Sequence, residues 1–213
     1  MWTSNNPLPV HNIIGERIRY YHHAGVKGYT AELLGHSPDN TLSIYLLAKL
    51  LWDADQDPDA LLAEFFGLYF QESAEPMRQF YQVLSSGVLR SARHGYRYLA
   101  HRSRGNLDPP LDSQMVASLR QLLTTATDMA RQPVVQRRLE REVTALRQYE
   151  LEVKIQELID SHRAKPSVET AAELRETITA ERAHYKRINH IVLYRPKSHT
   201  AWLREIEEEI EIH

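Results

Sequence analysis

Four aspartates at alternate positions, Asp53, Asp55, Asp57 and Asp59, form an acidic run that resembles the start of a calcium loop. Such a loop needs a glycine at its turn position, because the backbone bends sharply there. Pro58 occupies that position in this sequence. Asp57 followed by Pro58 is instead typical of a helix start. We therefore predict a solvated loop with a helix N-cap in place of a calcium site.

Histidines are the next candidates for metal or acid–base chemistry. His22 and His23 are adjacent, so on a helix their side chains point about 100° apart and do not share a face. No His-x-x-x-His pair stands elsewhere, and His11 and His36 are isolated. We predict loop or helix-end histidines and no metal site.

A basic stretch between Arg90 and Arg104 combines five arginines with histidines and tyrosines. It could bind a phosphate or a nucleic acid. The whole chain, however, carries 26 basic and 28 acidic residues, with a net charge of -2. This balance argues against a nucleic-acid partner, and acidic residues of the neighbouring helices could pair with these arginines.

Composition sets the remaining limits. The 213 residues are 42% hydrophobic and 25% charged, which is typical of a globular chain with its own core. The chain has no cysteine, which excludes disulfides, thiolate nucleophiles and cysteine-type zinc sites. No apolar run is long enough to span a membrane, and the N-terminus lacks a signal-peptide pattern.

Periodic apolar residues, separated by turn-forming residues, predict helices along most of the chain. These helices are expected at about 12–24, from Asp39 or Asn40 to Trp52, after Pro58, from about Ser73, at about 112–131, at 133–162, from Ser167 to Ile188, and around Trp202–Ile210. Gly25 is expected to end the first of them. The break at 106–110 suggests two units, 1–105 and 106–213, the second a helical bundle.

The segment Val26–Ala31 predicts a β-strand, since it is short, rich in β-formers and bounded by glycine and polar residues. The backbone groups of a strand need a neighbouring strand. We predict no second strand in this chain. The partner strands are therefore expected on another chain or in a segment outside this sequence.

Two segments are unusual in combination. The first is Ile14–Tyr29, in which a helix is followed by Gly25-Val26-Lys27-Gly28-Tyr29. The second is Tyr45–Asp55, a helix ending in Leu-Trp-Asp, followed by Asp59–Phe65. Over about residues 7–84 the chain resembles the bacterial family called domain of unknown function 4838. That family is similar to α-glucuronidases and hexosaminidase-type glycoside hydrolases, in which a (β/α)8 barrel precedes an α-helical region.

The resemblance implies a mainly α fold with one short β-strand, Val26–Ala31, from a truncated barrel. Glu32 would follow the strand at the end where barrel enzymes place their sites, and is the candidate catalytic residue. Glycoside hydrolysis uses two carboxylates, and no partner for Glu32 is identified in this chain. Tyr29, Lys27 and Trp52 are the implied substrate contacts, although spacing favours a core position for Trp52. No cofactor is expected.

The implied function is that of a C-terminal part of a glycoside-hydrolase-like, α-glucuronidase-like carbohydrate-active protein. Its helices would serve packing or homodimerisation, without catalysis by this chain alone. Carbohydrate would bind once the barrel is supplied. The alternative is a stand-alone α-helical protein-interaction module without enzymatic activity. Relatives in the family are often exported, so the compartment stays open.

Overall fold

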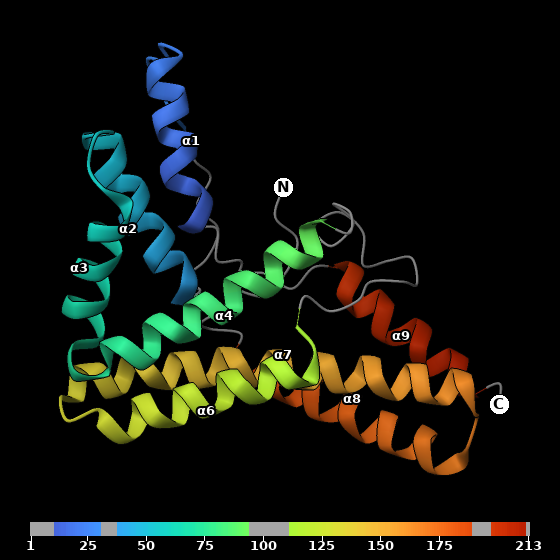
Figure 1. The fold of residues 1–213 in the computed structure, drawn as a ribbon. Helices are drawn as coiled ribbons and strands as arrows, with labels where there is room; N and C mark the ends of the chain where they lie inside the picture. The colour runs from blue at the N-terminus through green and yellow to red at the C-terminus, as the bar shows by residue number, and fades with distance from the viewer. Residues whose placement is uncertain (1–10, 31–37, 94–110, 189–196, 212–213) are drawn as a thin grey trace.

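The computed structural model describes residues 11–30, 38–93, 111–188 and 197–211 (Figure 1). Within these ranges the regular elements are all helical, which confirms the prediction of a mainly α fold. They are α1 (His11–His23), α2 (Pro38–Trp52), α3 (Pro58–Phe70), the short 3-10 helix η1 (Gln71–Ser73), α4 (Ala74–Arg93), α6 (Ser113–Met129), α7 (Pro133–Ala164), α8 (Val168–Ile188) and α9 (Lys197–Glu211).

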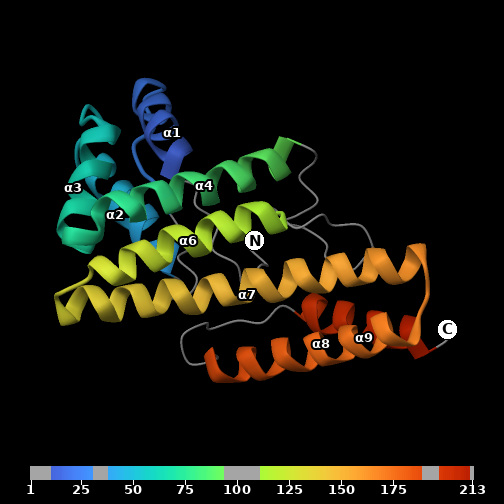
Figure 2. The same cartoon turned by 60° about the horizontal axis from the view of Figure 1, so that its bottom comes forward.

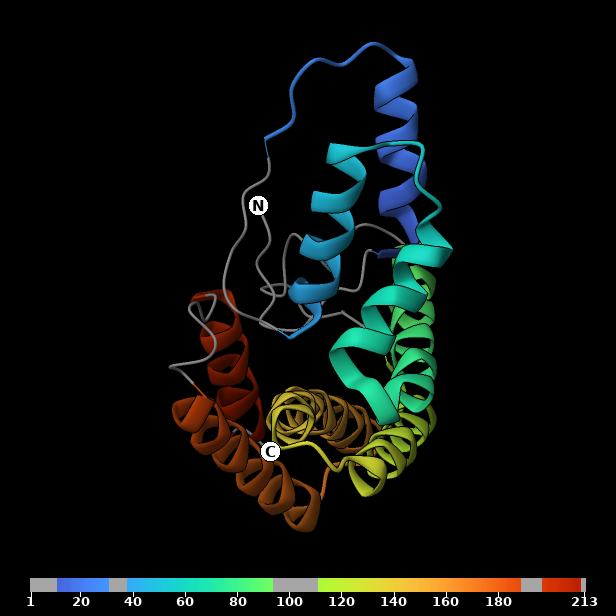
Figure 3. The same ribbon diagram turned by 90° about the vertical axis from the view of Figure 1, so that its left-hand side faces the viewer.

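Helix α7 is the long axis of the molecule. Its 32 residues correspond to about 48 Å at the usual rise per residue. Figures 1 and 2 show α6 and α4 along its N-terminal half, and α8 and α9 along its C-terminal half. Helices α1, α2 and α3 extend away from α7, on the side of its N-terminal half (Figure 3).

The buried apolar residues form two clusters, and α7 contributes to both. The larger cluster joins α1, α2, α3, α4, α6 and the first part of α7, from Ile18 to Val153. The smaller cluster joins Ile155 and Ile159 of α7 to residues of α8 and α9. The predicted division between residues 105 and 106 falls in a segment outside the described residues and stays a prediction.

Local signals set several helix ends, as predicted. Gly25 has φ 78° and follows α1. Its N–H donates to the carbonyl of His22, and the N–H of Val26 donates to that of Tyr21, which together form a Schellman cap. At the start of α8, Ser167 accepts a hydrogen bond from the N–H of Thr170.

One predicted boundary differs. Helix α2 already begins at Pro38, before the expected caps Asp39 and Asn40. Proline is favoured in the first turn of a helix, because its missing N–H has no partner there in any case. The proline therefore belongs to the helix.

The predicted strand at Val26–Ala31 is wrong. Residues 26–30 form neither strand nor helix, Ala31 lies outside the described residues, and the described ranges contain no strand. Val26 and Tyr29 are 48% and 46% exposed. The segment has β-forming residues, but strand formation depends on a neighbouring strand rather than on propensity alone. The truncated barrel that this strand implied is not supported by the structure either.

Candidate functional site

Of the residues implied to bind or cleave a sugar, the three that the structure describes are exposed. Glu32 falls outside the described residues. Lys27 and Tyr29 are exposed on the irregular segment after α1, where the Tyr29 ring lies 6.2 Å from that of Tyr21. Trp52, the last residue of α2, is 91% exposed, so the core position that its spacing favoured is wrong.

The acidic run supplies a helix N-cap, as predicted. Asp57 accepts a hydrogen bond of 3.1 Å from the N–H of Asp59 and is the N-cap of α3, and Asp53 accepts from the N–H of Asp55. Counting from Asp53, Glu64 occupies the twelfth position of a calcium loop, but it lies on α3 and pairs with Lys49 at 2.9 Å. Among the described residues, no group of three or more possible ligands could hold a metal ion.

The two adjacent histidines end α1. Their ring centroids are 5.9 Å apart, and Nδ1 of His23 lies 2.8 Å from the carbonyl oxygen of Arg19. His11 differs from them, because it is 5% exposed and its ring lies 6.2 Å from the ring of Tyr81. Burial lowers the pKa of His11 to about 4, so the imidazole is neutral at physiological pH.

The basic stretch remains untested. Residues 94–104 lie outside the described residues, and the side chains of the last turn of α4 are likewise outside the description. Binding of phosphate or nucleic acid by Arg90–Arg104 therefore stays a prediction.

Helices α2 and α3, which contact each other, carry four exposed large apolar side chains. On α2, Ile44 is 37%, Leu51 47% and Trp52 91% exposed, and on α3 Leu68 is 67% exposed. A helix that is apolar on all sides is normally covered by other protein. We call these four residues the α2–α3 apolar surface.

Charge is almost absent from these two helices. Lys49 is the one charged residue of positions 41–52, and Glu64 is the one charged residue of positions 60–70. The two side chains pair with each other at 2.9 Å, and Nζ of Lys49 lies 5.4 Å from the centre of the Tyr45 ring. Their pairing leaves positions 41–52 and 60–70 without a net charge, whereas the exposed aspartates of the turn between α2 and α3 and Asp59 of α3 lie close to Trp52 in the sequence.

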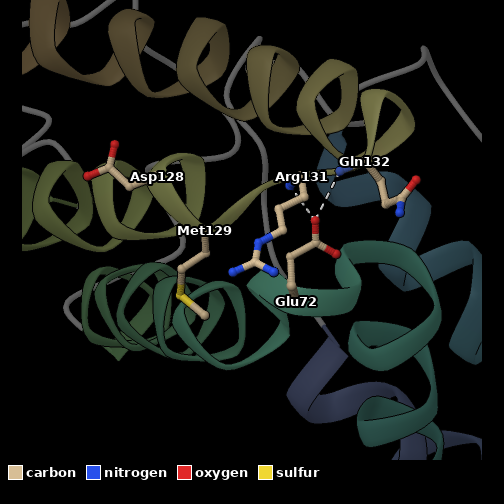
Figure 4. A pocket seen from close by; sticks show the side chains of 5 residues that line it. All are labelled: Glu72, Asp128, Met129, Arg131 and Gln132. Atoms are coloured by element: carbon tan, nitrogen blue, oxygen red, sulfur yellow. Dashed lines mark hydrogen bonds between the residues drawn. The ribbon is translucent and has the colours of Figure 1, made fainter.

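A hollow of about 540 Å³ lies where α6 meets α7 and η1 (Figure 4). It is lined by Glu72, Asp128, Met129, Arg131 and Gln132. The carboxylate of Glu72 accepts hydrogen bonds from the backbone N–H groups of Arg131 and Gln132, the latter at 3.0 Å. These bonds hold the two residues that precede α7, and they lower the pKa of Glu72. The carboxylate is therefore used in joining helices.

Sequence reasoning missed the buried polar residues of α7. Glu142 is 3% exposed and accepts a hydrogen bond of 2.8 Å from the hydroxyl of Tyr81. Gln148, also buried, donates to Glu152 at 3.0 Å and to Glu181 at 3.1 Å. Helical spacing could have indicated that Glu142 is buried. Buried positions of this part of α7 recur in steps of four and three, at 135, 139, 142, 146, 149 and 153.

These features describe a mainly helical protein with exposed apolar side chains on its N-terminal helices α2 and α3. In the part of the chain that the structure describes, no helix combines the length and the apolar character needed to cross a bilayer. The sequence comparison gives a family for the N-terminal region. Residues 3–82 match the family described as Domain of unknown function (DUF4838), which confirms the resemblance over 7–84 and identifies this part of the chain as a DUF4838 region.

Other comparisons gave no relative. No curated protein and no solved structure matches the chain. The α2–α3 apolar surface lies within the matched region, because α2 and α3 together end at Phe70.

Proposed function

We propose that this chain is a non-catalytic helical packing module of a glycoside-hydrolase-like, carbohydrate-active protein, and that the α2–α3 apolar surface docks on the barrel of that protein. The observation that carries the proposal is the exposure of Trp52, Leu51, Ile44 and Leu68 on helices whose only charges in 41–52 and 60–70 pair with each other. Contiguous exposed apolar patches mark interaction surfaces, and in this proposal the four side chains on the two contacting helices form one such patch.

The carbohydrate context rests on the resemblance of the DUF4838 region to α-glucuronidase-like proteins. The exposed positions of Lys27 and Tyr29 fit the same interpretation. In this interpretation they lie on the side of the module that meets the barrel, where residues near Glu32 would contribute to the sugar site. The helical remainder holds the module in place.

A second candidate is the stand-alone α-helical interaction module without enzymatic activity. One observation favours it: α1, α2 and α3 share a buried cluster with α4, α6 and α7. These helices are thus supported by their own chain and need no barrel for their packing. Both candidates use the α2–α3 apolar surface and differ in the partner.

The experiment measures binding of the full chain to a purified (β/α)8 domain of a DUF4838-containing glycoside-hydrolase-like protein by sedimentation velocity. The double variant Leu51→Glu/Trp52→Glu places two charges on the surface and should weaken binding at least about tenfold, because charges are desolvated on docking. The matched control is Thr124→Glu/Thr125→Glu, which adds the same charge at exposed positions of α6 and should bind as the unmodified chain does.

Three results would contradict the first candidate. Equal binding by both double variants would show that another surface docks. Absence of binding to the barrel, together with surface-dependent binding to other proteins or to itself, would favour the stand-alone module. Hydrolysis of aryl glucuronides or other aryl glycosides by the purified chain alone would contradict the non-catalytic role in both candidates.

A further inference from the structure

The turn that joins α2 to α3 places carboxylates next to the apolar side chains at the end of α2. Trp52, the last residue of α2, is 91% exposed, and Leu51 beside it is 47% exposed. The exposed aspartates that follow are Asp53, Asp55, Asp57 and Asp59. Figures 1 and 3 show this turn at the end of the two helices that points away from α7. A partner that covers the ring of Trp52 therefore also comes close to carboxylates.

The sequence around this turn is strongly acidic. Positions 50–77 contain seven acidic residues and no lysine, arginine or histidine. Three of the seven are bound inside the chain, to Lys49, to the backbone that precedes α7 and to Arg78, and these are Glu64, Glu72 and Glu75. The other four are the aspartates of the turn and of the start of α3.

These four aspartates form no ion pair among the residues that the structure describes. Two of them accept hydrogen bonds from backbone N–H groups, as Asp53 and Asp57 do in shaping the turn and the start of α3. Arg19 of α1 reaches the turn, but its guanidinium donates to the carbonyl oxygen of Gln56 at 3.1 Å. Four carboxylates against one guanidinium leave the turn with an excess of negative charge.

We infer that the partner docked on Leu51 and Trp52 is a protein surface with an apolar pocket bordered by lysine or arginine side chains. This inference rests on the proposed function, because it specifies the partner of the α2–α3 apolar surface. Trp52 supplies apolar area for the pocket, and tryptophan is enriched among the residues that dominate the binding energy of interfaces. Cations at the border attract the aspartates, whereas an acidic protein surface, a nucleic acid or an anionic lipid surface is repelled.

The apolar side chains and the aspartates act on different steps of binding. Trp52 lies at the centre of the docked surface, and loss of a central side chain mainly speeds dissociation. The aspartates lie at its border, where charges mainly set the rate of association and its dependence on salt. The two contributions can therefore be measured separately, as a dissociation rate constant and an association rate constant.

The test measures the binding rates of the full chain to the purified (β/α)8 domain of a DUF4838-containing glycoside-hydrolase-like protein by surface plasmon resonance. The measurement is made at 50 and at 500 mM NaCl. The association rate constant of the unmodified chain should fall at least about tenfold at the higher salt concentration, because salt screens the attraction between exposed charges. The dissociation rate constant should change far less.

Two double variants separate the charges from the apolar side chains. Asp53→Asn/Asp55→Asn keeps the side-chain shapes and an oxygen acceptor at position 53 for the N–H of residue 55. It should associate at least about threefold more slowly at 50 mM NaCl and show a smaller dependence on salt. Leu51→Ala/Trp52→Ala should dissociate at least about tenfold faster and keep the salt dependence of the unmodified chain.

The matched charge control is Glu205→Gln/Glu208→Gln, at exposed positions of α9, which should bind as the unmodified chain does. Equal association of the aspartate variant and the unmodified chain at both salt concentrations would overturn the inference and leave the proposed docking in place. Association that becomes faster with salt would also overturn it, because that result indicates an acidic partner surface. Absence of binding to the barrel domain would contradict the proposed function, and the inference with it.

Discussion

The hydroxyl of Tyr81 donates a hydrogen bond of 2.8 Å to Oε1 of Glu142, joining α4 to α7 inside the larger core. The two side chains are 1% and 3% exposed. Buried polar groups are retained when they are hydrogen-bonded, because the loss of a partner leaves the other group desolvated. This contact therefore fixes how α4 lies on the central helix.

Replacing Tyr81 by phenylalanine should lower the free energy of unfolding by about 1–3 kcal/mol, because Glu142 loses a donor while the ring packing is kept. Urea unfolding followed by circular dichroism measures the change. Tyr69→Phe is the control, since Tyr69 is only partly buried and its backbone carbonyl, rather than its hydroxyl, accepts from Arg138. A change for Tyr81→Phe no larger than the control's would contradict the role given to this bond.

His11 should make the stability depend on pH below neutrality. Its folded pKa of about 4 lies below the ordinary value of 6.5, so between these values the unfolded chain binds a proton that the folded chain does not. Stability therefore falls as the pH is lowered from 6.5 to 4, by on the order of 3 kcal/mol at most.

The variant His11→Phe keeps a ring against Tyr81 and should flatten this part of the pH profile. Unfolding in urea at several pH values between 4 and 7 measures it. His22→Gln removes an exposed histidine of the same helix and should retain the slope. An unchanged slope in His11→Phe would assign the pH dependence to other groups.

Two glycines on neighbouring helices should respond in opposite directions to the same substitution. A Cβ at Gly15 of α1 would lie 2.6 Å from Cγ of Pro58, whereas a Cβ at Gly67 of α3 would have nothing within 4 Å. Gly15→Ala should cost about 1–3 kcal/mol through overpacking, and Gly67→Ala should add about 0.5–1 kcal/mol through helix propensity. Thermal unfolding compares them, and stabilisation by both would show that α1 does not approach Pro58 closely.

The cap of α3 gives a further prediction. Asp57→Ala should destabilise the protein by about 1 kcal/mol, because the N–H of Asp59 loses its acceptor. Asp55→Ala is the matched control in the same turn. Chemical denaturation measures the difference, and equal effects of the two substitutions would argue against a capping role specific to Asp57.

These contacts show which parts of the fold could be predicted from the sequence. Helix ends at Gly25, Asp57 and Ser167 depend on a few neighbouring residues, and each was predicted correctly. The strand at Val26–Ala31 was wrong because strand formation depends on a distant partner, and the sequence pattern contains only the local preference.

The candidate site was less predictable for a related reason. Spacing alone favoured burial for Trp52, but only the packing of other helices decides which side of a helix is covered. Trp52 is exposed, and the charged Glu142 is buried. The positions implied for Lys27 and Tyr29 follow from a resemblance, and their role in sugar binding stays a prediction.

The most direct test of the proposed function is the fluorescence of Trp52 during docking. The variant Trp2→Phe/Trp202→Phe retains Trp52 as the sole tryptophan, and its emission should resemble that of tryptophan in water, since the side chain is 91% exposed. Addition of the purified (β/α)8 domain should shift the emission to shorter wavelength and protect Trp52 from acrylamide quenching. A complex that forms while Trp52 remains as accessible as before would contradict the claim that the α2–α3 apolar surface is the docking surface.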